Sequence, residues 1–456
     1  MAASCKHEAG TGRGRPPLFL AAARSTEDEG AAVTRIYRND LIYSVSYALD
    51  FVEREVVMVS THHSRRVAYL AASLGKSLGY SSEYLLNLAA CAALHDNALS
   101  EYQQRQALGG QPVTPENFLQ NLSLHCTMGE QNIAQLSFYP TVRGAILCHH
   151  ENADGSGPFG RTAEETPVFS RLIHIADTLD ARFDFSEMSP EKFSRIGAFV
   201  RANTGSLYDP RTAGAFLNCF STPESLSLDS LDQRLRKELP EVQAEYQPQE
   251  LIALASIFSK IIDYKSPFTC RHSSGIAEKA RQMGACYGWD ADTQAQLYLA
   301  GSLHDIGKLM VRSSVLEKPG LLTEEEYRHI QNHAYGSYLV LRSIRGMEEI
   351  SRWAYLHHEK LDGSGYPFGL TGKDLNQKER LMACLDIYQA LREDRPYKAG
   401  FDHEKAMKIL TEMGSRGQLD AQIIRDLDAC FGAPHAARRL EEEELAPASR
   451  CRVFPQ

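Results

Sequence analysis

The sequence lacks three features that would each mark a particular class of protein. No apolar run approaches the ~20 residues of a membrane-spanning helix, so membrane insertion is not expected. The ten cysteines contain no Cys-x-x-Cys pair and no regular spacing, which favours reduced, mostly buried thiols in a cytoplasmic protein. The net charge of −9 argues against a broad basic surface, so polymeric nucleic acid is not an expected partner.

The two ends of the chain differ from the rest in composition. Residues 1–32 carry basic side chains but no apolar signal-peptide core, and their Gly, Ala and Arg content is typical of a flexible tail. Residues 434–456 include the acidic run 441–444 and are predicted to form a second tail. The overall composition, with 43% hydrophobic and 23% charged residues, is ordinary for a globular chain.

Ten of the sixteen histidines fall into two matching sets, each with two aspartates. The first set is His63, His95, Asp96, His125, His149, His150 and Asp177, and the second is His272, His304, Asp305, His333, His357, His358 and Asp386. Matched residues lie 208 or 209 positions apart, and the flanking sequences at 61–68 and 270–277 and at 149–157 and 357–365 also match. This register predicts an internal duplication.

The pattern of apolar residues is helical. Residues 64–79 and 82–94 carry apolar stripes of helical period, the second running into His95, and the second copy has an equivalent stripe before His304. The sequence has no sustained alternation of apolar and polar residues, so no sheet is expected. Gly- and Pro-rich breaks predict loops at 108–115, 153–160, 318–320 and 362–369. We therefore expect an all-α fold.

The duplication divides this fold into two tandem helical bundles. We place the first copy at residues 33–220 and the second at 249–433. The polar stretch 221–248 would join them, and its Leu228, Leu231 and Leu235 favour a linking helix.

The matched residues suit a metal centre. Imidazole and carboxylate ligands favour Fe, Mn or Zn over Ca, and each set has more ligands than one tetrahedral ion needs. Two ions bridged by an aspartate, ~3.5–4 Å apart, are a standard arrangement for phosphoester hydrolysis. Lone histidines such as His174, His329, His403 and His435 are expected at the surface or in satisfied core positions, and His63 is favoured over His62 as a ligand.

Six segments of the second copy carry a family resemblance. They are HisAspIleGlyLys at 304–308, LysProGly at 318–320, LeuThrGluGluGlu at 322–326, HisHisGlu at 357–359, AspGlySerGlyTyrPro at 362–367 and AspArgProTyr at 394–397. Residues 255–430 thereby resemble the HD-GYP family, the branch of the HD-superfamily metallohydrolases that cleaves cyclic dinucleotides. The first copy is similar to the same family but diverged.

This resemblance implies roles for individual residues of the second copy. The five histidines with Asp305 and Asp386 would bind two divalent ions, with Fe or Mn favoured and Zn as an alternative. Asp305 and Lys308 would be catalytic, with the Lys308 ammonium contacting a substrate phosphate. Gly363, Tyr366 and Pro367 would shape the loop beside the metals and the substrate.

Two positions depart from patterns of the family. Gln389 stands at the second position of an Asp-x-x-Asp pattern that begins at Asp386, which removes a residue with an orienting role. Phe268 stands where some members carry a glutamate ligand for a third metal, which favours two ions over three.

The first copy keeps the metal-ligand set and also Asp180, but Asn97, Ala98 and Leu99 replace the Ile-Gly-Lys segment, and the loop tyrosine is deleted. Leu99 cannot supply the phosphate contact of a lysine. We expect this copy to hold metal in a regulatory or structural role. Independent catalysis on another phosphoester and an empty packing partner are the alternatives.

The resemblance therefore implies a bacterial signalling enzyme: a metal-dependent phosphodiesterase that hydrolyses a cyclic dinucleotide to a linear dinucleotide, with catalysis in the second copy. Cyclic di-GMP is the default substrate and cyclic GMP-AMP the competing one. The alternatives are a module that binds a cyclic dinucleotide or a partner protein with little turnover, and an HD-superfamily nucleotide phosphohydrolase. No sensor domain is recognisable, so a signal would enter through the first copy or a separate partner protein. A homodimer also stays open.

Overall fold

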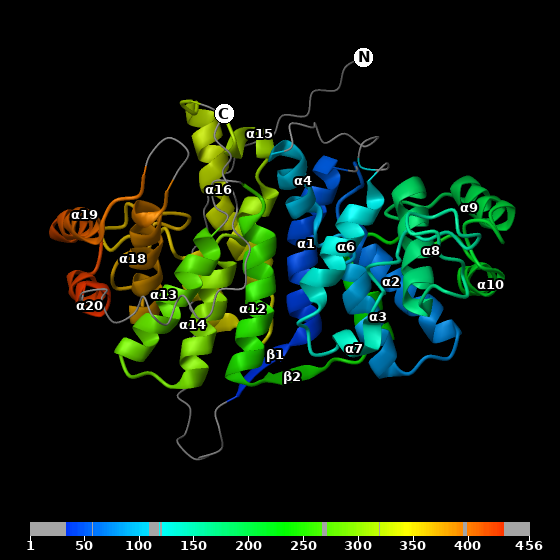
Figure 1. The fold of residues 1–456 in the computed structure, drawn as a ribbon, viewed down its shortest axis with the longest axis horizontal. Helices are drawn as coiled ribbons and strands as arrows, with labels where there is room; N and C mark the ends of the chain where they lie inside the picture. Colours follow the sequence, from blue (N-terminus) through cyan, green and yellow to red (C-terminus); the bar gives the residue numbers. More distant parts are fainter. Residues whose placement is uncertain are drawn as a thin grey trace.

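The computed structural model describes residues 33–56, 58–108, 118, 121–266, 271–318, 320–394 and 399–432. Helices make up most of these residues (Figure 1), which confirms the all-α prediction. Several predictions concern residues outside these ranges: both tails, most of the 108–115 loop, Phe268, His435 and the ArgProTyr segment at 395–397.

The first copy forms a bundle in which the expected helices are present. Its elements are α1 (Arg38–Val56), α2 (His63–Ser77), α3 (Ser82–Ala93), α4 (Leu99–Leu108), α6 (Leu122–Ile133), α7 (Tyr139–Val142), α8 (Val168–Phe183), α9 (Pro190–Ala202) and α10 (Pro210–Cys219). The predicted stripe of α2 is its packing face, because Val67, Leu70 and Leu74 are fully buried. The linker contains α11 (Leu228–Glu238), in agreement with the expected linking helix.

The second copy repeats this order of elements. It consists of α12 (Pro248–Asp263), α13 (His272–Cys286), α14 (Ala291–Leu303), the 3₁₀ helix η1 (Ile306–Met310), α15 (Ser313–Leu316), α16 (Glu324–Leu341), α17 (Glu348–Tyr355), α18 (Gln377–Arg392), α19 (His403–Ser415) and α20 (Ala421–Phe431). One continuous apolar core runs through both copies.

A small sheet joins the copies, and here the prediction of no sheet is wrong. Strands β1 (Thr34–Tyr37) and β2 (Gln243–Tyr246) pair antiparallel, with Thr34 opposite Tyr246 and Tyr37 opposite Gln243. Four residues are too few for an alternating pattern to stand out in the sequence. The strands lie 209 residues apart, the spacing of the duplication, so equivalent segments pair across a pseudo-two-fold axis, as in an isologous dimer.

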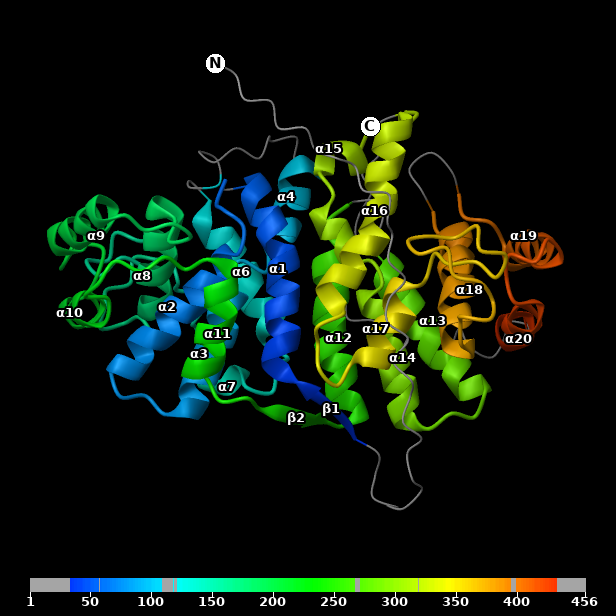
Figure 2. The ribbon, with the colours of Figure 1, turned by 180° about the vertical axis from the view of Figure 1, so that it is seen from behind.

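The helices that follow the strands continue this arrangement. Helix α1 contacts η1 and α16 of the second copy, and α12 contacts α4 of the first. Helices α1 and α12 occupy the middle of the molecule, with α9 and α10 at one end and α19 and α20 at the other (Figures 1 and 2). The two copies therefore pack through equivalent elements.

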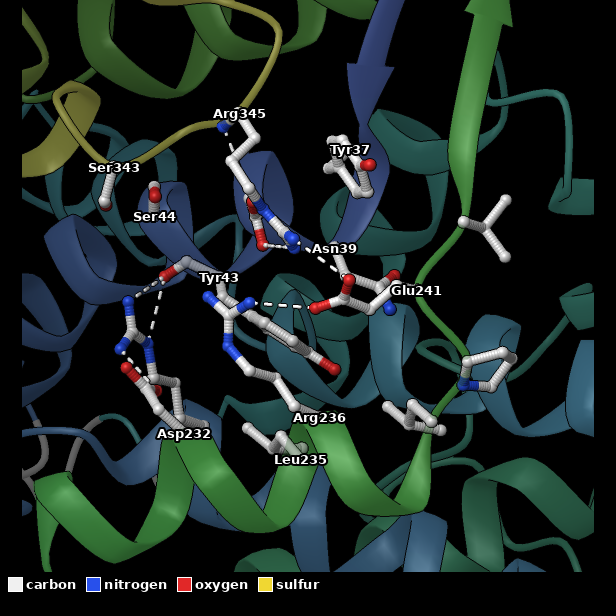
Figure 3. Close-up of a pocket in the computed structure, with 15 residues that line it drawn as sticks. Tyr37, Asn39, Tyr43, Ser44, Asp232, Leu235, Arg236, Glu241, Ser343 and Arg345 are labelled. Carbon is white, nitrogen blue, oxygen red and sulfur yellow. Dashed lines mark hydrogen bonds and ion pairs between the residues drawn. The ribbon is translucent and has the colours of Figure 1, made fainter.

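An arginine-rich pocket lies at this junction (Figure 3). Arg345 of the second copy lies 4.0 Å from the centre of the Tyr37 ring and donates to Asp40 at 2.6 Å and to Glu241 at 3.0 Å. Arg236 also donates to Glu241, at 2.9 Å. Because both guanidinium groups already have carboxylate partners, the pocket is better suited to holding the copies together than to binding an anion.

The expectation of reduced thiols is wrong for two cysteines. Cys286 and Cys430 form a disulfide with an S–S distance of 2.03 Å. They are 144 residues apart in the sequence and meet because α20 packs against α13, which the spacing of cysteines does not reveal. None of the described helices combines the length and hydropathy that crossing a bilayer requires.

Candidate metal centres

Five segments bring the second set of predicted residues together. His272 is the first residue of α13, His304 and Asp305 follow α14, and His333 lies in α16, as the ranges of these helices show. His357 and His358 follow α17, and Asp386 lies in α18. All of these side chains are buried except that of His358, which is 24% exposed.

Asp305 lies at the centre of this cluster. Its Oδ1 is 3.2 Å from Nε2 of His333 and 3.9 Å from Nε2 of His357. Its Oδ2 is 3.0 Å from Nε2 of His304 and 3.6 Å from Nε2 of His272. The two oxygens of this carboxylate therefore face different histidines, and either oxygen could contribute to a metal site.

Asp386 completes the cluster from the other side. Its Oδ1 is 3.2 Å from Nε2 of His272, and its Oδ2 is 3.3 Å from Nδ1 of His358. The second aspartate therefore connects the histidine that opens the set to one that lies near its end.

The backbone fixes the orientation of three imidazoles. Nδ1 of His304, His333 and His357 lies 2.8, 2.6 and 2.7 Å from the carbonyl oxygen three residues earlier. Each Nδ1–H therefore donates to the backbone, which leaves the Nε2 lone pair facing the cluster. Among the described residues, no donor faces the buried Nε2 of His304, and a cation would satisfy its lone pair. These donors fit a divalent metal ion.

The site concentrates opposite charges. Burial would raise the pKa of Asp305, but His304 and Lys308 hold that pKa well below its usual value. Burial lowers the pKa of His272, yet hydrogen bonds with Asp386 and Glu393 raise it to about 10. Burial lowers the pKa of His333 to about 3. Without metal, the cluster therefore contains carboxylates, a protonated His272 and a neutral His333.

Lys308 points at the cluster. Its Nζ donates to Oδ2 of Asp305 at 2.5 Å, and its side chain is 19% exposed. Burial lowers the pKa of Lys308, but the Asp305 carboxylate more than offsets this and raises it. The ammonium charge is therefore held beside the central carboxylate.

The predicted loop lies over the same cluster. The Tyr366 ring packs against the His358 ring with centroids 4.6 Å apart, and Pro367 is buried. Gly363 has a φ of 78°, in the left-handed region that favours glycine. A pocket of about 440 Å³ opens beside the cluster and is lined by His357, His358, Tyr366 and Asp386 among others.

Glu359, quoted in the HisHisGlu segment without a role, holds this loop in place. Its two carboxylate oxygens accept hydrogen bonds from the backbone N–H groups of Phe368 and Leu370 at 2.7 and 2.8 Å. Glu151 does the same in the first copy, accepting from Phe159 at 2.6 Å and from residue 161 at 2.7 Å. The presence of HisHisGlu in both copies, at 149–151 and 357–359, is the sequence feature that could have identified these two glutamates.

Two further carboxylates escaped the sequence comparison. Asp50 accepts a hydrogen bond from the N–H of Ser64 at 3.0 Å, and Asp263 accepts one from Ser273 at 2.9 Å. Each anchors the start of the helix whose first residue belongs to the cluster. Their positions differ by 213, not 209, so they fall outside the register of the repeat.

The first copy assembles its own set in a similar way. Asp96 Oδ1 lies 3.3 Å from Nε2 of His125 and 3.6 Å from Nε2 of His149. Asp177 Oδ1 lies 3.1 Å from Nε2 of His63 and 3.7 Å from Nε2 of His95. His150 Nδ1 is 3.8 Å from the other oxygen of Asp177. The residues predicted for the first copy therefore also form a cluster, and its geometry is consistent with a metal site.

The surroundings of the first cluster differ. Leu99, matched to Lys308, is fully buried in the apolar core, so no ammonium lies beside Asp96 from that position. The buried thiol of Cys126 lies 3.7 Å from His125, and Ala334 occupies the matched position of the second copy. Burial raises the pKa of that thiol well above its usual value.

The unmatched histidines among the described residues lie outside both clusters or behind them. His62 stacks on Tyr47, with ring centroids 5.0 Å apart. Nδ1 of His174 lies 3.0 Å from the carbonyl oxygen of His149, and His403 bonds to Tyr388 and Asp428. His329 is half-buried.

Comparisons with known proteins agree with this arrangement. The sequence model of the HD domain matches residues 52–211 and 256–423. A 3'3'-cGAMP-specific phosphodiesterase (number 1) of Vibrio cholerae is 28% identical over 394 residues, which cover 84% of this chain and 89% of that protein. Another from the same organism (number 3) is 34% identical over 301 residues, covering 64% and 63%. A cyclic di-GMP phosphodiesterase of Pseudomonas aeruginosa is 38% identical over 128 residues, covering 28% and 30%.

One solved structure supports the fold. The crystal structure of a cyclic GMP-AMP specific phosphodiesterase from V. cholerae superimposes with a TM-score of 0.59 at 23% identity. The match covers 88% of this chain and 99% of that one, so both copies share in it.

Proposed function

Because the chain belongs to the HD domain family, we propose that it is a metal-dependent phosphodiesterase that opens a cyclic dinucleotide, with catalysis in the second copy. The observation that carries this proposal is the cluster around Asp305 and Asp386, which adjoins a pocket of about 440 Å³. That volume lies within the range of small-molecule sites. The homology to cyclic-dinucleotide phosphodiesterases supports the same conclusion.

The ligands in our proposal are those predicted from the sequence: the five histidines of the second copy with Asp305 and Asp386. Two divalent ions bound there, Fe or Mn in preference to Zn, would supply Lewis acidity and lower the pKa of water. Asp305 would hold both ions, because its two oxygens face different histidines. Lys308, held at 2.5 Å from Asp305, adds positive charge where a phosphate would approach.

The reaction itself is a hydrolysis. A P–O bond forms to the oxygen of one water, and one P–O ester bond of the ring breaks. The products of that step are a phosphomonoester and a free hydroxyl in one linear dinucleotide. Tyr366, which lines the pocket and packs against His358, is placed to contact the substrate, and Gly363 and Pro367 shape the loop that carries it.

We further propose 3'3'-cGAMP as the preferred substrate. Two relatives with that printed specificity align over 84% and 64% of this chain and a third over 34%, whereas cyclic di-GMP phosphodiesterases align over 28% to 42%. The first copy would hold metal in a regulatory or structural role, since Leu99 is buried where the second copy has Lys308.

The direct test is anaerobic incubation with 3'3'-cGAMP and, separately, with cyclic di-GMP in the presence of Mn or Fe(II), followed by chromatography. We expect a linear product that depends on metal and forms faster from 3'3'-cGAMP. Faster cleavage of cyclic di-GMP would refute the substrate preference. Absence of product from both, with metal content verified, would refute hydrolysis and favour a binding module.

A further inference from the structure

The two copies orient their first histidine in different ways. In the first copy, His63 Nδ1 donates to Asp180 at 2.6 Å while Nε2 faces Asp177 at 3.1 Å. Asp180 is in turn held by Arg66, whose Nε and Nη2 donate to its two oxygens at 2.7 and 2.9 Å. All of these side chains are buried. A hydrogen-bonded carboxylate behind a metal-binding histidine fixes both its tautomer and its orientation.

The second copy has lost both members of this support. Gln389 stands at the position matched to Asp180, and Gly275 at the position matched to Arg66. Nevertheless, His272 Nδ1 has a carboxylate partner, because both oxygens of Glu393 lie 3.1 Å away. Gln389 Nε2 donates to Glu393 at 2.6 Å and so orients this carboxylate, as Arg66 orients Asp180 in the first copy.

The helical period explains how Glu393 reaches this position. Asp386 and Gln389 lie in the last turns of α18 and Glu393 is the residue that ends it, so their spacing of i, i+3, i+7 puts them on one side of the helix end. Asp386 contacts Nε2 of His272, and Glu393 contacts Nδ1 of the same ring two turns later. The residue matched to Glu393 is Asp184, which accepts from Ser60 at 2.9 Å instead.

Gly275 belongs to the same set of changes. A Cβ at this position would lie 2.3 Å from Nε2 of Gln389, so any side chain would displace the glutamine. The glycine thus leaves the space that Gln389 occupies. The pair Arg66 and Asp180 and the trio Gly275, Gln389 and Glu393 are two alternative ways of holding one histidine.

We propose that Glu393 is the positioning residue of His272 and replaces the lost aspartate, so that Gln389 does not impair the second metal centre. This inference rests on the proposed metal centre of the second copy. Glu393 is not a metal ligand in this proposal, because it contacts the ring nitrogen that faces away from Asp386.

The test measures Mn²⁺ affinity in the full chain by competition with a fluorescent chelator. The relevant class of sites is the one that Asp305→Ala removes. We expect Glu393→Ala to weaken this class about 10–100-fold, as measured for other partners of metal-bound histidines. Asp184→Ala, at the matched position of the first copy, is the control and should leave this class unchanged.

A rescue variant separates positioning from general damage to the fold. Gly275→Arg with Gln389→Asp, added to Glu393→Ala, transplants the support found in the first copy and should restore the affinity. Hydrolysis by Glu393→Ala should recover at saturating Mn²⁺ with an unchanged KM. The Mn²⁺ affinity is measured without any hydrolysis. A chain that binds Mn²⁺ as expected but hydrolyses nothing would therefore contradict the proposed function and not the role of Glu393.

Three outcomes would overturn the proposal. The first is wild-type affinity in Glu393→Ala. The second is a raised KM with unchanged affinity, which would make Glu393, with its side chain 17% exposed beside the pocket, a substrate contact. The third is a rescue variant that is folded by circular dichroism yet binds Mn²⁺ as weakly as Glu393→Ala.

Discussion

Removing the charge of the central carboxylate from each copy in turn tests which copy is catalytic. Asp305→Asn and Asp96→Asn keep the shape of the side chain and are a matched pair. Asp305 is buried among four imidazoles at 3.0–3.9 Å and Lys308 at 2.5 Å. The asparagine would leave the ammonium facing an amide and could no longer bridge two ions.

The magnitude follows from linkage. An ion present at 100 times its Kd stabilises the folded state by about 2.7 kcal/mol per site. At roughly 2–4 °C per kcal/mol for a domain of 150–250 residues, this is about 5–10 °C of metal-dependent gain in Tm for each bound ion. Asp305→Asn should lose that gain for the second copy together with hydrolysis. Asp96→Asn should lose only the gain that comes from the first copy.

The assay combines thermal denaturation with and without Mn²⁺, metal content by elemental analysis, and chromatography of the products. If Asp96→Asn abolishes hydrolysis in a folded chain, the assignment of catalysis to the second copy is wrong. If Asp305→Asn retains both its metal and its activity, the site itself is misassigned.

Three other predictions concern the second copy. Lys308→Leu, which copies Leu99, should lower kcat about 10²-fold while metal content stays unchanged, and loss of metal in this variant would contradict a role at the phosphate. Tyr366→Ala should raise KM for the cyclic dinucleotide, because the ring lines the pocket beside His358; steady-state kinetics would show it, and an unchanged KM would argue against contact. His272 has a pKa raised to about 10 and carries a proton at neutral pH, so metal binding should release a proton and tighten as pH rises. Calorimetry in buffers of different ionisation enthalpy measures the release, and zero release would contradict that charge state.

The register of the repeat predicted most of the two clusters, because metal ligands are constrained in both residue type and position. Asp305 and Asp386 were found this way, and the structure places them among the histidines of their set. The all-α fold followed from stripes such as that of α2, where a 3.6-residue period matches burial.

The features that were missed depend on contacts between distant segments. Glu393 belongs to no motif in the sequence, and only the fold places it with Gln389 beside His272. The Cys286–Cys430 bond requires α13 and α20 to be packed together. The β1–β2 ribbon has four residues per strand, and its pairing partner is 209 residues away.

That ribbon has a consequence for how the two copies work together. Two separate chains with this interface would dissociate on dilution and would present two identical sites. Here β1 and β2 pair within one chain, so the second copy always has its partner at a high effective concentration and in a fixed ratio of one to one. Because the two copies are joined in one chain, the residues of one copy can diverge while the interface with the other copy is kept. The difference between Leu99 and Lys308 is an example of such divergence.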